Sequence, residues 1–485
     1  MTGPVKPIPI LGNLTEEQRA AADRLQKSTR FILNLQTGFG KTRVTLTALA
    51  DVMNKYPFVY GIAVIPIAAI KIFLKELRES VPIPFYINTT QVKKSDPNPR
   101  LFIYTYQTLE KHVKDIQQLH SKKYKLALIM DEVHELRTGD TTAFSVIKEQ
   151  RDKFSAAWGM TATPLLSDIH GLYNVVNTIA PKYLGTKKAF RETFLIEKKL
   201  YIRGRKWTPR NQLTEIVGYK NLELLKKLLD DISLIKRRDY DLRFYFRSDD
   251  PLEDEMAAYV QAAHDIVSEK KWGAGLHTLQ RTIDNGCEPF IKDDLTVKEK
   301  LLINTVQSVL ARDECTLIYV SYYSTLDRLK EIFTRYRDLL RLGNIYTISG
   351  KDTKLSRRVV EDKISPRDIA LITDAASVSY NLGRCNNIIF YNLPFIIGGF
   401  IQIVGRITRM DSIHDWQNVF VIEARNTIDT YKKLLIQENI KLIRSLFGNE
   451  THLPGQFIPD IIDRAFIKNC RKKLLWKLRS GKKRK

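Results

Sequence analysis

Short apolar runs alternate with amphipathic stretches twice along the chain, from about residue 14 to 180 and from about residue 297 to 431. This alternation is typical of parallel strands covered by helices. The strand candidates of the first region are Phe31–Leu35, Gly61–Ile65, Leu101–Tyr104, Leu126–Met130 and Ala156–Met160. Those of the second region are Thr316–Val320, Asn344–Ile348, Ile369–Thr373, Asn387–Tyr391 and Val419–Ile422. The pattern therefore predicts an α/β protein with two parallel-sheet domains.

The stretch between the two regions has a different character, rich in lysine, arginine and aromatic residues, as in YIRGRKWTPR. It contains too many large apolar residues to stay unfolded. We therefore expect a mostly helical insertion between the two sheets, and a helical extension with a basic tail at the end of the chain. The predicted domains are 1–180, the insertion 181–296, the second sheet domain 297–435, and the extension 436–485.

The chain carries a large excess of positive charge. Its 78 Lys and Arg residues against 54 Asp and Glu residues give a formal net charge of +24. Such an excess attracts polyanions, above all nucleic acid. The alternative is a basic enzyme whose charge has no such role. Residues 464–485 hold eleven lysines or arginines and no acid, which fits a binding element and a solvated end equally well.

Cysteine usage and hydropathy point away from secretion and from membranes. The four cysteines stand apart from one another, which argues against a zinc site and a disulfide framework and favours a reducing compartment. The amino terminus lacks the apolar run of a signal peptide. The longest apolar stretch, Val59–Ile70, is too short to cross a bilayer. We expect a cytoplasmic protein, in the host cytoplasm if the source is viral.

The segment QTGFGKT follows the first strand candidate and precedes a helix rich in Leu and Ala. Gly38 and Gly40 would let backbone N–H groups turn toward phosphate oxygens at a helix start. Lys41 would reach the β- and γ-phosphates, and the Thr42 hydroxyl would bind Mg²⁺. Leu35 stands where the longer phosphate-loop pattern has glycine. The predicted ATP-binding residues of this loop are Thr37, Gly38, Phe39, Gly40, Lys41 and Thr42.

A second candidate segment, DEVH, follows the apolar strand LALIM. At a strand end near the phosphate loop, Asp131 would hold Mg²⁺, partly through water, and Glu132 would deprotonate the attacking water. His134 is a candidate for coupling the nucleotide site to motion. Thr161 and Thr163 follow the next strand, and their hydroxyls could hydrogen-bond to His134 and report the nucleotide state.

The stretch FIQIVGRITRMDS supplies further catalytic candidates, Gln402, Arg406 and Arg409. The two arginines are three residues apart and would share one face of a helical turn. Their guanidinium groups could neutralise charge on a transferred phosphoryl group.

QTGFGKT, DEVH, TAT and QIVGRITR stand in the order and spacing of the superfamily-two helicases, which this chain resembles. The resemblance covers about residues 14 to 430. It implies two RecA-like domains, with ATP between them and the nucleic-acid strand across both. It also implies that Gln18 reads adenine.

The resemblance extends to the residues that contact nucleic acid in this family. It assigns Pro66, Thr105 and Tyr106 to this role in the first domain, and Ser377 and Asn381 in the second. The segment SVSYNL corresponds to the coupling motif of the second domain in this family, and it has Ser379 where glycine is usual.

Within this superfamily the segments TATPLLSDIHGLYNVVNTIAPKYLG and NLPFIIGGFIQIVGRITRMD are most similar to the Swi/Snf-like group. The short chain looks more like a phage or other viral member than a nuclear remodeller. The resemblance implies a monomeric, DNA-stimulated ATPase, a helicase or double-strand translocase, that works in replication, recombination or repair, in company with proteins of those pathways. Two alternatives are an RNA-directed helicase of viral transcription and a nucleic-acid clamp without turnover.

Overall fold

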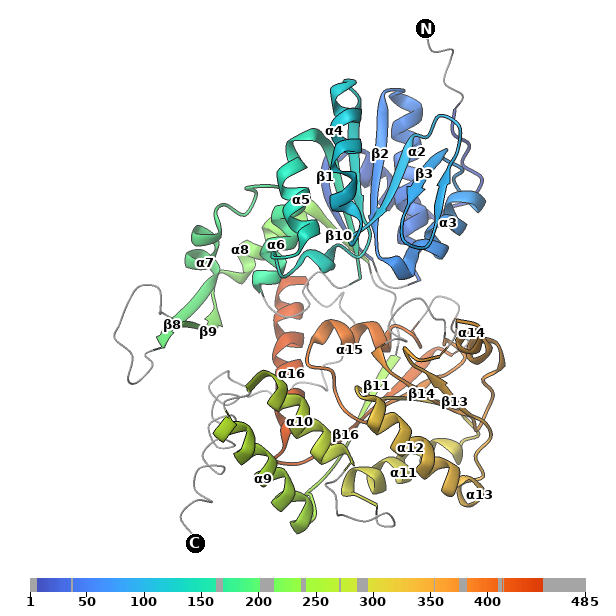
Figure 1. The fold of residues 1–485 in the computed structure, drawn as a ribbon, viewed down its shortest axis with the longest axis vertical. Coiled ribbons are helices and arrows are strands. Elements are labelled where there is room, and N and C mark those ends of the chain that lie inside the picture. The colour runs from blue at the N-terminus through green and yellow to red at the C-terminus, as the bar shows by residue number, and fades with distance from the viewer. Residues whose placement is uncertain are drawn as a thin grey trace. The chain divides into compact units, whose positions relative to one another are not determined.

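Two β-sheets form the centres of two units of the chain (Figure 1). This computed structural model describes residues 7–35, 38–162, 169–200, 213–236, 241–269, 272–285, 295–352, 354–374, 382–408, 412 and 414–447. The first unit runs to the end of β10 and also includes the chain from Ile443; the second includes the chain from β11 to Leu442.

The first sheet has the strand order β10-β1-β7-β6-β2-β5-β3-β4. Its strands are β1 (Arg30–Leu35), β2 (Val59–Ile65), β3 (Phe85–Asn88), β4 (Lys93–Ser95), β5 (Leu101–Thr105), β6 (Lys125–Met130), β7 (Phe154–Thr161) and β10 (Ser233–Lys236). All neighbours are parallel except β3 and β4. The five strands predicted for this region are confirmed, and β3, β4 and β10 are additional.

Helices cover both faces of the first sheet because each carries apolar residues on one side. One group is α1 (Glu16–Gln26), α2 (Lys41–Lys55) and α3 (Ile70–Glu79), which share one apolar core with the sheet. A second group is α4 (Val113–Ser121), α5 (Thr142–Gln150), α6 (Ile169–Ile179) and α8 (Leu222–Ile232). The remaining elements are α7 (Lys187–Phe194), the hairpin β8 (Leu195–Leu200) and β9 (Leu213–Tyr219), and the 3₁₀ turns η1 (Ile67–Ala69), η2 (Leu109–His112), η3 (Val133–Leu136) and η4 (Arg151–Lys153).

The second sheet is parallel throughout, with the order β11-β16-β15-β12-β14-β13. Its strands are β11 (Asp241–Asp249), β12 (Thr316–Tyr319), β13 (Ile345–Ile348), β14 (Ile369–Ile372), β15 (Asn387–Phe390) and β16 (Trp416–Ala424). The five strands predicted here are also confirmed. The helices of this part of the chain are α9 (Glu253–Glu269), α10 (Trp272–Asn285), α11 (Val297–Leu310), α12 (Tyr323–Arg335), α13 (Arg337–Leu340), α14 (Lys354–Lys363), α15 (Ile397–Val404) and α16 (Ile428–Phe447). The protein is thus an α/β protein with two RecA-like parallel-sheet domains.

Residues 181–296 supply an edge strand to each sheet. Strand β10 pairs in parallel with β1, and β11 pairs in parallel with β16 along its whole length. Residue periodicity did not indicate either strand, and the domain boundaries proposed from the sequence stay a prediction. Among the described residues no helix has the length and hydrophobicity needed to span a lipid bilayer.

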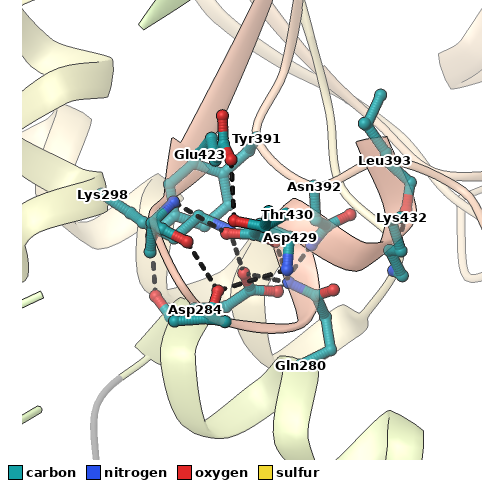
Figure 2. A network of polar contacts seen from close by, with 12 residues as sticks. Gln280, Asp284, Lys298, Tyr391, Asn392, Leu393, Glu423, Asp429, Thr430 and Lys432 are labelled. Carbon is teal, nitrogen blue, oxygen red and sulfur yellow. Dashed lines mark hydrogen bonds and ion pairs between the residues drawn. The ribbon is translucent and has the colours of Figure 1, made fainter. Parts of the chain in front are cut away.

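A buried ionic network holds α10 against the rest of the second unit (Figure 2). The ammonium group of Lys298 on α11 lies 2.6 Å from a carboxylate oxygen of Asp284 and 2.8 Å from one of Asp429. Gln280 donates hydrogen bonds to both carboxylates, and Asn392 donates one to Asp284. The network therefore ties α10, α11, the exit of β15 and the start of α16 to one another.

Water cannot reach the charges in this network, so each charge depends on its partners for stabilisation. The side chains of Lys298 and Asp284 are 0% exposed. Burial lowers the pKa of Lys298, but the two carboxylates outweigh that effect and leave its pKa above the usual value. Burial raises the pKa of Asp284, and Lys298 opposes the rise. Removing one partner would leave an uncompensated buried charge, which is strongly destabilising.

We therefore expect Lys298→Met to lower the free energy of unfolding by about 3–5 kcal/mol, measured by urea titration. The double variant Lys298→Met/Asp284→Asn should recover part of the loss. The matched control is Lys226→Met on α8, because Lys226 forms a partly exposed ion pair with Asp230. That change should cost about 1 kcal/mol or less. Equal effects of the two single variants would contradict a stabilising role for the buried network.

Candidate functional site

Three neighbouring strands of the first sheet end side by side. Strand β1 pairs with β7 up to Asn34 and Thr161, and β7 pairs with β6 up to Gly159 and Met130. Because these strands are parallel, the residues that follow them emerge at the same edge of the sheet, where α/β proteins bind their ligands. The glycine-containing loop, the residues after β7 and the acidic pair after β6 are therefore neighbours.

The glycine-containing loop has a backbone shape that other residues adopt poorly. Gly38 and Gly40 have φ angles of 88° and 87°, in the left-handed region. A Cβ atom on Gly40 would also lie 2.8 Å from the Gln18 amide nitrogen. Helix α2 begins directly afterwards, and no side chain caps its amino terminus. The partial positive charge of that helix end is thus directed at the loop, as in known phosphate sites.

Gln18 links helix α1 to this loop. Its side-chain oxygen accepts a hydrogen bond from the Thr15 backbone N–H, and its Nε2 donates one of 2.7 Å to the Phe39 carbonyl. The residue is buried. The observed partner of Gln18 is therefore the loop backbone, a contact that sequence reasoning missed. Adenine reading by Gln18 stays a prediction.

Lys41 and the acidic pair lie within electrostatic reach of each other. The ammonium group of Lys41 donates a hydrogen bond of 3.0 Å to the Leu35 carbonyl. Asp131 is only 7% exposed. Burial and the neighbouring Glu132 charge raise the pKa of Asp131 to about 7, while Lys41 opposes the rise. A further cation beside Asp131 would stabilise its ionised form.

The residues at this edge fit a bound Mg²⁺. Asp131 offers a carboxylate whose charge is incompletely compensated, and Thr42 offers a hydroxyl in the first turn of α2. In nucleotide sites Mg²⁺ takes only one or two protein ligands and completes its octahedron with waters and phosphate oxygens. Accordingly, no cage of three or more His, Cys, Asp or Glu side chains is needed, and the described residues contain none.

Glu132 and His134 are close together on the turn after β6. The His134 Nδ1 atom lies 3.2 Å from a Glu132 carboxylate oxygen and 3.0 Å from the Thr161 hydroxyl. The contact with Thr161 is a hydrogen bond in which either group donates, depending on the tautomer of His134. Glu132 itself adopts a left-handed backbone with φ 49°, which is uncommon for a residue with a side chain. Thr163, the other proposed coupling residue, lies outside the described residues.

Tyr106 supports the acidic strand end. Its hydroxyl donates a hydrogen bond of 2.7 Å to the Asp131 carbonyl, and burial raises the pKa of Tyr106 well above its usual value. Thr105 is fully buried, and its hydroxyl pairs with that of Thr108. Pro66 precedes η1 at the end of β2. Sequence reasoning assigned these three residues to nucleic acid and missed the bond from Tyr106 to Asp131. Direct contact with nucleic acid stays a prediction for all three.

In the second unit, α15 carries Gln402 and is followed by Arg406, which is 5% exposed. Phe400 of this helix stacks on Phe390 of β15, with ring centroids 4.8 Å apart, and so fixes the helix on the sheet. The Arg406 carbonyl accepts a hydrogen bond from the Leu382 N–H. The predicted site residues Thr37, Ser377, Asn381 and Arg409 lie outside the described residues.

Known protein families match both units. Residues 11–166 match the family described as type III restriction enzyme, res subunit, and residues 298–411 match the helicase conserved C-terminal domain. The first match contains the glycine loop and the DEVH turn, and the second contains α15 and Arg406.

Two curated proteins resemble the chain over most of its length. The uncharacterized ATP-dependent helicase YqhH of Bacillus subtilis is 22% identical over 86% of this chain and 76% of its own length. The uncharacterized ATP-dependent helicase MG018 of Mycoplasma genitalium is 20% identical over 82% of this chain, which spans only 38% of that relative.

Among solved structures, the Sulfolobus solfataricus SWI2/SNF2 ATPase core in complex with dsDNA is 16% identical and covers 97% of this chain and 98% of its own, with a TM-score of 0.41. That score is too low to support an argument. The two family matches and the two relatives support a helicase-type, ATP-dependent protein, to which this chain is similar over most of its length.

Proposed function

We propose that this protein is a DNA-stimulated ATPase of the DExH type that moves along DNA as a helicase or double-strand translocase in replication, recombination or repair. The observation that supports it best is the convergence at one sheet edge of the glycine loop, Lys41 and the Asp131–Glu132 pair. The preference for DNA over RNA, the closeness to Swi/Snf-like proteins and the viral or phage origin come from the sequence resemblance alone.

Each residue of the edge has a proposed part in hydrolysis. Lys41 and the amino terminus of α2 hold the phosphates of ATP. Thr42 and Asp131 hold Mg²⁺, which when bound neutralises charge on the phosphate oxygens. Glu132 accepts a proton from the attacking water, within reach of His134. Because His134 also contacts Thr161 at the end of β7, a change at Glu132 can be passed to a second strand exit.

The second unit is proposed to contribute the residues Gln402, Arg406 and Arg409. Arginine side chains stabilise the charge on a transferred phosphoryl group through bidentate hydrogen bonds. Arg406 is largely buried in the structure, so we propose that it acts after a local rearrangement on ATP and DNA binding. We propose that the protein acts as a monomer.

The acidic pair generates the first prediction for this site. Lys41→Ala and Glu132→Gln should each lower ATP turnover at least a hundredfold, because one removes the phosphate contact and the other the base. Only Glu132→Gln should still bind ATP with near wild-type affinity, measured with a fluorescent analogue. Glu135→Gln is the matched control, because Glu135 lies exposed on the same turn and should not change turnover. Near-normal turnover by Glu132→Gln would rule out its role as the base.

Gln18 generates a second prediction, on nucleotide selectivity. We expect the Gln18 amide to hydrogen-bond to adenine and also to support the loop. Gln18→Ala should then raise the KM for ATP about tenfold or more and reduce discrimination against GTP. Gln26→Ala on the same helix is the control, because Gln26 contacts Asp51 and not the loop. A raised KM with unchanged selectivity would assign Gln18 to loop support alone.

A third prediction concerns the arginine helix. Arg406→Ala should lose about a thousandfold in DNA-stimulated ATPase, while ATP and DNA binding stay within a few-fold of wild type. Arg425→Ala is the control, because Arg425 is an exposed arginine of the same unit that pairs with Asp249. Full stimulated turnover by Arg406→Ala would favour the alternative in which the protein clamps nucleic acid without a completed motor.

A further inference from the structure

Aromatic and lysine side chains gather at the amino edge of the first sheet, where the strands begin, opposite the candidate nucleotide site. They come from two short segments, one from the end of α2 to the start of β2 and the other from the turn before β6 to its first residue. We call this surface the amino-edge patch; its members are Lys55, Tyr56, Phe58, Tyr60, Lys122, Lys123, Tyr124 and Lys125. None of these residues has a part in the proposed hydrolysis.

The two segments form one surface because β2 and β6 are neighbours. Val59 is in register with Lys125, and the Lys125 N–H donates a hydrogen bond of 3.0 Å to the Phe58 carbonyl. The rings of Tyr60 and Tyr124 are stacked, with centroids 4.1 Å apart and an interplanar angle of 29°. Tyr60 and Tyr124, which are 64 positions apart in the sequence, thus form a single aromatic surface.

The buried residue Arg100, which directly precedes β5, supports this surface. Its guanidinium donates hydrogen bonds to the carbonyls of Met53, Pro57 and Val59, and it lies 5.9 Å from the centre of the Tyr60 ring. The turn that carries Tyr56 and Phe58 is therefore held in place by a buried cation. A surface fixed in this way loses little conformational freedom when it binds a ligand.

The outer rings of the patch are exposed to solvent. Phe58 is 68% exposed and Tyr56 is 52% exposed, on either side of Pro57. A single exposed apolar residue is ordinary, but several together, surrounded by charge, are typical of an interaction site. More than half of each of these two residues is thus exposed to a ligand that could stack on it.

The charge of the patch is positive. Lys55, Lys122, Lys123 and Lys125 are exposed, and none of them takes part in the ion pairs recorded among the described residues. Lys55 itself lies 5.3 Å from the centre of the Tyr56 ring. Four lysines beside exposed rings complement a ligand that is both polyanionic and aromatic. Single-stranded nucleic acid has both properties, whereas an acidic peptide satisfies only the lysines.

We propose that the amino-edge patch is a second nucleic-acid site, which binds single-stranded DNA or RNA by stacking bases on Tyr56 and Phe58 and contacting phosphates with the lysines. The proposal takes from the proposed function only that nucleic acid is a partner of this protein. The patch begins where the strands begin and the nucleotide site lies where they end, so the two can be tested separately. Such a site would hold a displaced or trailing strand while the motor acts.

The test uses the full chain and a fluorescein-labelled oligo(dT) probe, with binding measured by anisotropy over a range of salt concentrations. Tyr56→Ala/Phe58→Ala should weaken binding about tenfold or more, because stacking contributes about 1–3 kcal/mol per base. Lys122→Ala/Lys123→Ala/Lys125→Ala should lower the slope of log affinity against log salt by about 2, since each lysine releases about 0.7 counterion from a single strand. Both variants should keep the basal ATPase rate.

Leu224→Ala/Lys227→Ala is the matched control, because it removes an exposed apolar side chain and an exposed lysine from α8 of the same unit. It should bind oligo(dT) as wild type does. Photo-cross-linking to an iododeoxyuridine-substituted oligonucleotide, read by mass spectrometry, should label the patch aromatics.

Wild-type affinity and salt slope in both patch variants, with no cross-link at the patch, would overturn the proposal. Polyglutamate serves as a second, purely anionic probe. If the patch variants lost polyglutamate binding and kept oligo(dT) binding, the proposal would be overturned in favour of an acidic peptide. If the patch cross-linked to the oligonucleotide but nucleic acid did not change the ATPase rate, the proposed motor function would be contradicted and the proposal of a nucleic-acid site at the patch would stand.

Discussion

The chemistry proposed for the first unit depends on one constraint, the parallel pairing of β1, β7 and β6. Parallel strands bring their carboxyl ends to one edge, so residues as far apart in the sequence as Asn34 and Thr161 become neighbours. Lys41 follows β1, the Asp131–Glu132 pair follows β6, and Thr161 ends β7. A slip of one residue in either pairing would turn the apolar side chains of that strand to the other face of the sheet and would displace the residues that follow the strand. The apolar registers that fix the pairing therefore also fix the site.

The buried carboxylates of the two units differ in the partners that surround them. Asp284 and Asp429 share the ammonium group of Lys298, and Gln280 and Asn392 donate hydrogen bonds to their oxygens, so protein groups hold both carboxylates without any ligand. Asp131 lies beside the Glu132 carboxylate. Burial and this neighbouring charge raise the pKa of Asp131 to about 7, although Lys41 opposes the rise. The first arrangement stabilises a fold. The second leaves room for a cation, which is the property that a nucleotide site requires.

The sequence predicted ten strands, nine inside the two sheets and β13 at an edge, because each contains a short apolar run. It predicted the glycine loop from the segment QTGFGKT, in which Gly38 and Gly40 have left-handed backbones. It missed β11, whose residues are largely half-exposed or exposed and carry charge, so that their pattern is that of a surface segment. It also missed the buried network, because Lys298 and Asp284 have no local signal that distinguishes them from surface charges. Long-range contacts such as Gln18 with Phe39 depend on packing and leave no trace in spacing.

The most direct measurement is the ATPase rate of the purified full chain without nucleic acid and with single-stranded DNA, duplex DNA, forked DNA and RNA, compared side by side. The account predicts a low basal rate and a rise of at least tenfold with DNA, larger than that with RNA, because nucleic acid favours the hydrolysing state of such a motor. A larger rise with RNA would reassign the substrate. Hydrolysis that no nucleic acid changes, or no hydrolysis under any condition, would contradict the motor itself.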